Sequence, residues 1–371
     1  MDDIGCLRDD LALELLRRDP REIDAQLSLF IVAANSLRHY SSLRPFPSSI
    51  MSNKNSSGDY DIYSLRQLID QIPVVKSLPN VIHNPEIISD DVACLLHWIL
   101  LEHPTGLKLS IVDEEEEINK VLRLAGHEIV ESLRPTHIFK VFTNKSARLE
   151  SQYNGKLNGD IYGYHGSKLQ NFYSILSNGL QQHRNEVSLF GQGIYLSTDL
   201  NVVQYFSGSS TNWNKSILGA QSNCVLLCEC YDHPDVKMSS SDPSRGFIEG
   251  SEGGRVPDKY IVVRSNDLII NKYLFVYSRG NSKFQITRPN KSDGFLTWIF
   301  SHKVALLFIS YALILFAIGF SKTNAVYRYL RRWDLGSHNL YAEEASSSFA
   351  SFPRYLFSMS SSPFQINMKL R

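Results

Sequence analysis

The sequence predicts an α+β protein: an N-terminal α-helical bundle, a domain with a mostly antiparallel sheet, and one C-terminal transmembrane helix. Three observations predict this class. Hydrophobic residues repeat at helical spacing within residues 1–112, short segments typical of strands follow within residues 136–282, and residues 304–320 contain no charged side chain.

The composition is that of a globular protein with more than one domain. The chain has 371 residues, of which 43% are hydrophobic and 20% are charged. Lys+Arg and Asp+Glu both number 38, so no overall positive charge attracts a phosphate backbone and we expect no nucleic acid partner. Five cysteines are too few for a disulfide scaffold, which favours a reducing compartment.

The first region, residues 1–112, is predicted to be α-helical. Leu27, Phe30, Ile31 and Ala34 follow the i, i+3, i+4, i+7 spacing of an amphipathic helix, and the same spacing recurs in residues 92–100. An acidic run opens the linker predicted at residues 113–135. We interpret this run as a solvated connector rather than a functional acidic patch.

Short β-branched and aromatic segments dominate the second region, residues 136–282, and are bounded by Gly, Pro, Asn, Asp or Ser. One helix interrupts them at residues 169–179, with Gly179 as its C-terminal stop. The predicted strands cover residues 137–142, 194–197, 224–231, 260–264 and 272–278.

Residues 296–320 form the predicted transmembrane helix, and residues 321–371 a flexible tail. The uncharged part spans roughly 26 Å at helical rise, close to the ~30 Å hydrocarbon core of a bilayer. A buried core helix is the alternative. The N-terminus lacks the basic and apolar parts of a signal peptide, so we expect the large N-terminal region to face the cytosol.

Three motifs carry candidate chemistry: Gly163-Tyr164-His165-Gly166-Ser167, Gly191-Gln192-Gly193-Ile194-Tyr195-Leu196, and Lys272-Tyr273-Leu274-Phe275-Val276-Tyr277. Each alone is weak, since Gly-x-Gly without a third glycine does not make a Rossmann dinucleotide site. Together, in this order, they resemble the His-Tyr-(Glu or other) signature of the diphtheria-toxin-like ADP-ribosyltransferases, the fold of the poly(ADP-ribose) polymerase (PARP) family.

Further stretches resemble one branch of that family, the tail-anchored mono-ADP-ribosyltransferases of the endoplasmic reticulum with an N-terminal helical domain. These stretches are Leu43-Arg44-Pro45-Phe46-Pro47, Ser188-Leu189-Phe190-Gly191, Asp232-His233-Pro234-Asp235-Val236-Lys237, Ser251-Glu252-Gly253-Gly254 and Lys259-Tyr260. The resemblance implies a diphtheria-toxin-like fold, NAD as co-substrate, and acceptor proteins that include the protein itself. It also implies the endoplasmic reticulum membrane, with the nuclear envelope as a further location, and a cytosolic catalytic domain.

The resemblance assigns roles to residues of the candidate site. His165 would bind a ribose hydroxyl of NAD, the backbone of Gly166 would bind the carboxamide, and Tyr195 would stack on nicotinamide. A second aromatic ring, from Tyr205 or Phe206, would close the other face of nicotinamide. The catalytic residues are therefore predicted to be His165, Tyr195 and Tyr273.

Tyr273 limits the predicted product. Chain-elongating members have Glu at the third position of the signature, whereas a phenol with an ordinary pKa near 10 is a poor general base at neutral pH. Transfer of a single ADP-ribose, with release of nicotinamide, is the expected reaction. A packed strand aromatic is the structural alternative for Tyr273, and a catalytically silent membrane adaptor that binds NAD or ADP-ribose is the alternative function.

A zinc site and a second enzyme activity are less well supported by the sequence. Cys224, Cys228 and Cys230 near His233 do not have the spacing of a zinc site and fit a strand better, so we expect no metal. A tRNA 2′-phosphotransferase, which shares the fold, would need more basic residues than Lys168 and Arg184 around its site.

Overall fold

The structure, a computed structural model, describes residues 2–50, 60–126, 129–153, 159–184, 189–240 and 242–279. These residues belong to one compact unit, Met1–Ile286. Within these ranges no helix combines the length and hydropathy needed to cross a membrane. The predicted transmembrane helix at residues 296–320 and the tail at 321–371 lie outside the described residues.

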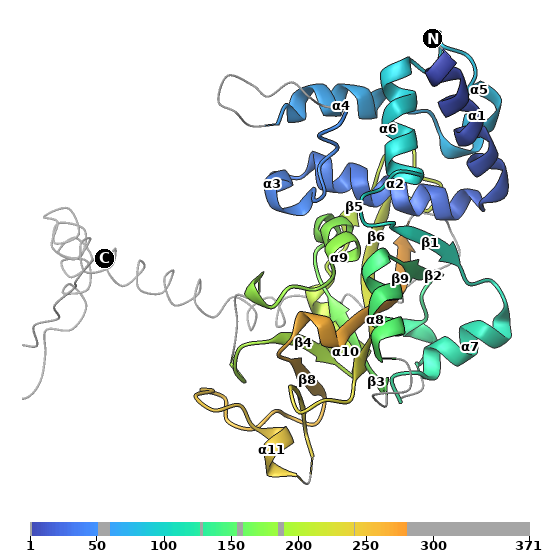
Figure 1. Cartoon of the computed structure of the whole chain (residues 1–371). Helices are drawn as coiled ribbons and strands as arrows, with labels where there is room; N and C mark the ends of the chain where they lie inside the picture. The colour runs from blue at the N-terminus through green and yellow to red at the C-terminus, as the bar shows by residue number, and fades with distance from the viewer. Residues whose placement is uncertain are drawn as a thin grey trace, which may run out of the picture. The chain divides into compact units, whose positions relative to one another are not determined.

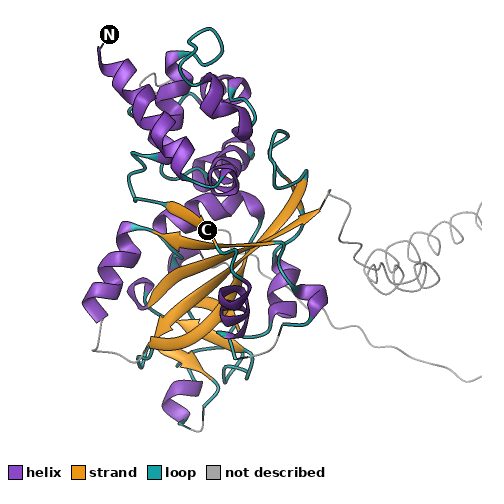
Figure 2. Ribbon diagram, turned by 90° about the vertical axis from the view of Figure 1, so that its right-hand side faces the viewer, coloured by secondary structure: helices purple, strands orange, loops and turns teal. Residues whose placement is uncertain are grey.

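The N-terminal region is helical, as its hydrophobic spacing predicts. Figure 2 shows its helices gathered beyond one end of the sheet. The longer helices are α1 (Asp2–Arg17), α2 (Pro20–Asn35), α4 (Ile62–Gln71) and α6 (Asp90–Leu100), and the shorter ones are α3 (His39–Ser42), the 3-10 turn η1 (Val75–Ser77) and α5 (Leu78–Val81).

Helix α2 lies at the centre of this region. It begins with Pro20 after the N-cap Asp19, whose carboxylate accepts a 2.7 Å hydrogen bond from the backbone N–H of Arg21. Phe30 of α2 packs edge-on against Trp98 of α6 and against Tyr173, with ring centroids 6.3 and 5.3 Å apart. Since Tyr173 belongs to the second region, one hydrophobic core runs through both regions.

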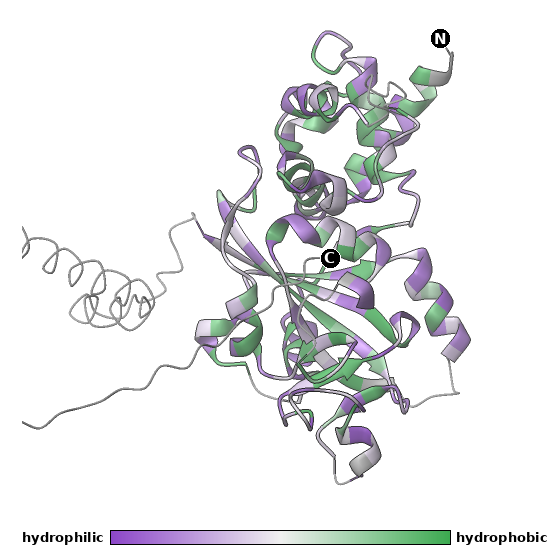
Figure 3. Ribbon diagram, turned by 90° about the vertical axis from the view of Figure 1, so that its left-hand side faces the viewer, coloured by the Kyte–Doolittle hydropathy of each residue, from purple (hydrophilic) through white to green (hydrophobic). Residues whose placement is uncertain are grey.

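The second region is built on an antiparallel sheet with the order β1-β2-β9-β6-β3-β4-β8-β7, and β5 pairs with β6 (Figure 1). The strands are β1 (Lys108–Ile111), β2 (His137–Phe142), β3 (Gly159–Gly166), β4 (Ile194–Ser197), β5 (Ser210–Thr211), β6 (Gln221–Tyr231), β7 (Val236–Met238), β8 (Tyr260–Val263) and β9 (Ile269–Arg279). The mostly antiparallel sheet predicted from the sequence is confirmed. The central strands carry mostly hydrophobic residues, which are green in Figure 3.

Short helices connect and cover these strands. They are α7 (Glu115–Arg123), α8 (Asn144–Tyr153), α9 (Phe172–Asn178), α10 (Leu200–Phe206) and α11 (Pro243–Gly246), with 3-10 turns at Glu131–Leu133, Leu169–Asn171, Gln182–Arg184 and Asn266–Leu268. The helix predicted at residues 169–179 is confirmed as a 3-10 turn followed by α9. Gly179 ends it with a φ of 78°, a value that favours glycine.

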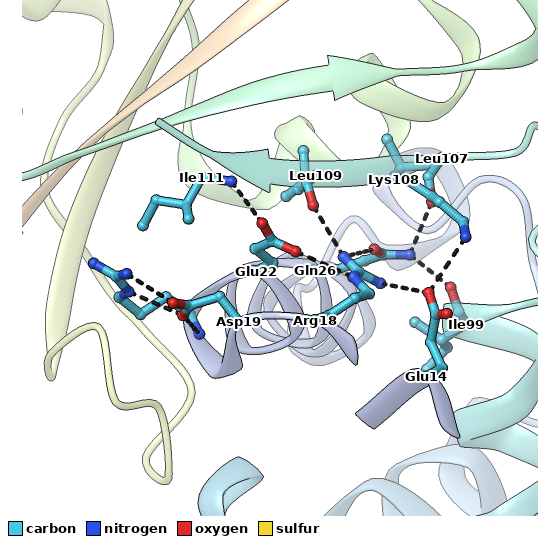
Figure 4. A network of polar contacts seen from close by, with 11 residues as sticks. Glu14, Arg18, Asp19, Glu22, Gln26, Ile99, Leu107, Lys108, Leu109 and Ile111 are labelled. Carbon is cyan, nitrogen blue, oxygen red and sulfur yellow. Dashed lines mark hydrogen bonds and ion pairs between the residues drawn. The ribbon is translucent and has the colours of Figure 1, made fainter. Parts of the chain in front are cut away.

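A polar network joins the helices to the edge strand β1 (Figure 4). Arg18 donates a 3.1 Å hydrogen bond to the carbonyl of Leu109, and Glu22 accepts one of 2.8 Å from the N–H of Ile111. Gln26 donates to the carbonyls of Ile99 and Leu107, at 2.7 and 3.0 Å. The network satisfies backbone groups of β1 that have no strand partner on that side.

The acidic run of the linker begins α7 and forms ion pairs. Glu115 pairs with Arg134 at 2.5 Å, and Glu117 pairs with Lys140 of β2 at 2.6 Å. Val121 and Leu122 of α7 are buried against one face of the sheet. The linker is therefore packed on the sheet through its apolar side.

Candidate active site

His165 lies near the end of β3 and has a defined tautomer. Its Nδ1 lies 3.1 Å from the backbone carbonyl oxygen of Tyr195. Because a carbonyl can only accept, Nδ1 carries the proton and Nε2 keeps a lone pair. Packing around the ring lowers the pKa of His165 below its ordinary value, against the smaller opposing effect of the hydrogen bond to Tyr195. The ring is therefore a neutral hydrogen-bond acceptor at neutral pH.

Tyr195 lies on β4, the strand next to β3. Ile194 and Leu196 are buried, at 3% and 2% exposure, so the side chain of Tyr195 points to the other face, as strand alternation predicts. Its hydroxyl donates a 2.8 Å hydrogen bond to the carbonyl of Gly191 and accepts one of 2.9 Å from the N–H of Phe190. These two bonds fix the ring against the loop that precedes β4.

His165 and Tyr195 line one cavity of about 460 Å³. The rest of its described lining is mostly polar, and no Asp or Glu is among these residues: Arg38, Ser41, Ser167, Asn171, Ser174, Ile175, Asn178, Gly179, Leu180, Gln181, His183 and Ile194. Two of them, Arg38 and Ser41, come from the N-terminal helical region. A polar lining with no carboxylate among its described residues is suited to an anionic ligand with many hydroxyl groups.

Gly166 is required by the packing of the protein itself. A Cβ at this position would lie 2.3 Å from the carbonyl oxygen of Val203 and 2.6 Å from Oγ of Ser207. Helix α10 and the residue after it therefore already fill the space that a side chain would need. Only glycine lets α10 lie against the end of β3.

The predicted second aromatic ring is not found in the cavity. Tyr205 and Phe206 end α10, with 88% and 58% of their surfaces exposed, and their rings meet edge-on at 5.6 Å. Neither ring is among the described residues that line the cavity with His165. The geometry does not favour one of them over the other.

The structure does not bring Tyr273 to His165. Tyr273 pairs with Leu227, which pairs with Tyr164, so these three side chains share one face of the sheet. Tyr195 shares this face as well, because Ser197, two residues further along β4, pairs with Tyr164, so the distance and not the face separates Tyr273 from the site. Tyr273 also lies three strands from Tyr195, roughly 14 Å at the usual spacing, and packs in the hydrophobic cluster under α7.

Tyr260, to which the sequence assigned no role, lies beside Tyr195. In the pairing of β4 with β8, Tyr195 is opposite Val262 and Ser197 is opposite Tyr260, so both tyrosines point to the same face as diagonal neighbours. The ring of Phe190 lies between them in the same cluster, 6.5 Å from Tyr195 and 5.9 Å from Tyr260. The stretch Lys259-Tyr260 was visible in the sequence, but its pairing with β4 was not.

The three neighbouring cysteines are structural in this arrangement. Cys224, Cys228 and Cys230 are buried in β6, at even spacing and therefore on one face of the strand. Burial raises the pKa of each thiol, so all three are protonated and packed as small apolar side chains.

Two protein-family models match this chain, one before the edge strand β1 and one after it. Residues 14–100 match the ARTD15 N-terminal domain, and residues 114–275 match the poly(ADP-ribose) polymerase catalytic domain. The second range contains His165, Tyr195, Tyr260 and Tyr273.

Two known proteins are similar to this chain over almost their whole length, and a third over a shorter range. Protein mono-ADP-ribosyltransferase PARP16 of Mus musculus is 31% identical over 331 residues, which cover 86% of this chain and 97% of the mouse protein. The Homo sapiens protein of the same name is 33% identical over 337 residues, again 86% and 97%. Protein mono-ADP-ribosyltransferase PARP8 of Mus musculus is more distant, at 23% over 193 residues. The chain therefore belongs to the PARP family of ADP-ribosyltransferases and is similar to PARP16 over most of its length.

Proposed function

We propose that this protein transfers a single ADP-ribose from NAD to protein side chains and releases nicotinamide. The observation that carries the proposal is the neutral His165, whose free Nε2 lone pair belongs to a polar cavity shared with Tyr195. NAD offers such a site two ribose units with hydroxyl donors. The similarity to mono-ADP-ribosyltransferases gives the reaction class.

The site residues take distinct roles in this proposal. His165 accepts a hydrogen bond from a ribose hydroxyl, and Tyr195, fixed through its own hydroxyl, offers its ring to nicotinamide. Tyr205 or Phe206, both exposed at the end of α10, supplies the second ring. The backbone of Gly166 is held in place by α10 and is available to the carboxamide. Cleavage then depends on holding the strained nicotinamide–ribose bond beside the acceptor.

The third position of the signature is proposed to be Tyr260 rather than Tyr273. Tyr260 is a diagonal neighbour of Tyr195 on the paired strand β8, whereas Tyr273 lies on β9, three strands away. Either assignment supplies a phenol where a carboxylate would be needed to activate a second ADP-ribose. The product is therefore a single ADP-ribose, and the acceptor's own side chain completes the reaction.

The same proposal includes the membrane anchor. Residues 296–320 would cross the endoplasmic reticulum membrane or the nuclear envelope once, and residues 136–282 would act on the cytosolic side. Acceptors would include the protein itself, and neither nucleic acid nor a metal would take part. Residues 1–112, 113–135 and 321–371 would serve as helical domain, linker and tail.

Incubation of the full-length protein with labelled NAD tests the activity. Wild type should modify itself or an added acceptor, and His165→Ala and Tyr195→Ala should label at least ~100-fold less, because both remove contacts to NAD. Equal labelling by wild type and both variants would refute the activity. If NAD raises the melting temperature of wild type without any turnover, the silent adaptor replaces the enzyme.

A matched pair of variants tests the third position. Tyr260→Phe and Tyr273→Phe each remove one hydroxyl from a half-buried strand tyrosine. We expect Tyr260→Phe to lower the rate of transfer and Tyr273→Phe to leave it unchanged. The opposite result would return the role to Tyr273.

A further inference from the structure

The cavity that holds His165 and Tyr195 is not made by the catalytic domain alone. Arg38 and Ser41 lie on its wall, and they belong to the N-cap and helix of α3 in the N-terminal region. Among the described residues that line this cavity, Arg38 is the only Lys or Arg. Within the described lining, the permanent positive charge therefore comes from a residue outside the catalytic domain.

Specific bonds hold α3 beside the cavity. Asn178 of α9 donates a 2.8 Å hydrogen bond to the carbonyl of Arg44, and the hydroxyl of Tyr173 donates one of 3.0 Å to the carbonyl of Pro45. Helix α9 follows the His165 motif after one 3-10 turn, and α3 packs against this helix (Figure 1). The segment that carries Arg38 is thus attached to the helix that forms one wall of the cavity.

The guanidinium of Arg38 is available for a ligand. Within the part of the chain that the structure describes, this side chain is exposed and makes no hydrogen bond or ion pair. The neighbouring arginines are engaged differently, since Arg44 donates to the carbonyl of Tyr40 and Arg66 to that of Ala34. A guanidinium presents a planar pair of N–H donors that matches two oxygens of a phosphate.

We propose that Arg38 binds the diphosphate of NAD, so that the helical region completes the NAD site. The proposal rests on the proposed function, because it takes NAD as the ligand of this cavity. The diphosphate carries two negative charges, and no carboxylate from the described lining opposes its binding. The helical region is then a part of the binding site, and any movement of α3 away from α9 would weaken NAD binding.

The test compares ligands with and without phosphate on the full-length protein. Dissociation constants are measured by calorimetry for ADP-ribose, for adenosine and for benzamide, a nicotinamide mimic. Arg38→Gln should weaken ADP-ribose binding at least ~10-fold and leave benzamide and adenosine unchanged, as expected for the loss of a charged hydrogen bond. Arg38→Lys should recover part of the affinity, because it keeps the charge but loses the paired donors.

A matched control and a turnover measurement complete the design. Arg17→Gln removes another exposed arginine of the helical region and should bind all three ligands as wild type does. With NAD as substrate, Arg38→Gln should raise KM and leave kcat within about twofold. If Arg38→Gln binds ADP-ribose as tightly as wild type, the inference fails and the proposed function stands. If wild type binds neither ADP-ribose nor benzamide, the proposed function fails first.

Discussion

His103 Nε2 lies 3.0 Å from the hydroxyl of Tyr173, across the boundary between the helical region and α9. The direction of each hydrogen bond around this pair is fixed. Tyr173 donates to the carbonyl of Pro45, so its oxygen accepts from Nε2–H of His103, and Nδ1 of His103 then accepts from the hydroxyl of Thr105 at 3.0 Å. Only the neutral imidazole satisfies this chain of bonds.

This arrangement makes stability depend on pH. Burial lowers the pKa of His103 from the ordinary 6.5 to about 4. Between these values the unfolded chain binds a proton that the folded chain does not, so the free energy of unfolding rises with pH. As pH falls from 7 to 4 we expect this residue to cost roughly 3 kcal/mol of stability. Urea unfolding measured at several pH values between 7 and 4 checks this loss of stability.

The contribution of His103 is isolated by comparison with His103→Gln. His137 and His165 also have lowered pKa values and add to the slope of wild type. The variant keeps these two, so its stability should vary less between pH 7 and 4. Parallel curves for both proteins would contradict the lowered pKa of His103.

Tyr173→Phe should destabilise the protein by about 1–3 kcal/mol, because it leaves the buried Nε2–H of His103 without its 3.0 Å partner. The carbonyl of Pro45 also loses a donor. Tyr40→Phe, which removes a hydroxyl from a side chain 66% exposed, is the control and should change little. The measurement is the free energy of unfolding of each variant. Equal values for Tyr173→Phe and Tyr40→Phe would show that the hydrogen bond between His103 and Tyr173 does not stabilise the protein.

Gly166→Ala should destabilise the protein and lower transfer activity. Its Cβ would meet the backbone carbonyl of Val203 at 2.3 Å, which cannot move without shifting α10. Overpacking of this kind costs about 1–3 kcal/mol. Gly208→Ala, with nothing within 4 Å of the added Cβ, is the control from the same segment. If the Gly166→Ala variant is as stable and as active as wild type, α10 does not pack tightly against the end of β3.

The affinity for ADP-ribose should depend less on pH between 8 and 6.5 than it would with a histidine of ordinary pKa. Because the pKa of His165 is lowered, less of its ring is protonated in this range than at the ordinary pKa, and the proton on Nδ1 leaves Nε2 to accept a ribose hydroxyl. Affinity should fall mainly at lower pH, when the ring becomes protonated. Calorimetry in a His183→Gln background, which removes the other imidazole of the cavity, measures this. A loss of affinity with its midpoint at or above 6.5 would contradict the assignment.

The sequence predicted local features of the fold well. The strands at residues 137–142 and 194–197 and the stop at Gly179 agree with the structure, because alternation and glycine at positive φ are local signals. Strand β3, which carries His165, was not predicted. Its glycines, Gly159, Gly163 and Gly166, lower the β-propensity of the segment, although Gly163 and Gly166 are needed for close packing.

The candidate site was predicted less completely, because it depends on pairing between distant strands. The imidazole Nδ1 of His165 is hydrogen-bonded to the backbone carbonyl of Tyr195, and neither local pattern reveals this bond. Tyr260 and Tyr273 have similar sequence surroundings, both a tyrosine after a lysine at a strand. Only the register of β4 with β8 distinguishes them. Arg38 was not predicted as a site residue, because the hydrophobic pattern of its region predicts helices but does not indicate a ligand.

Strand β1, residues Lys108–Ile111, falls between the two matched family regions, 14–100 and 114–275. A fragment cut at either of those limits loses it. The shortened catalytic fragment would present β2 as an open edge, with Phe139 and Val141 beside it no longer covered by the helices. An open strand edge can pair with the same edge of a second molecule. Fragments that end at the limits of the family matches should therefore aggregate. Extending the start to include residue 108 would not suffice, since β1 needs Arg18, Glu22 and Gln26 to satisfy its outer side.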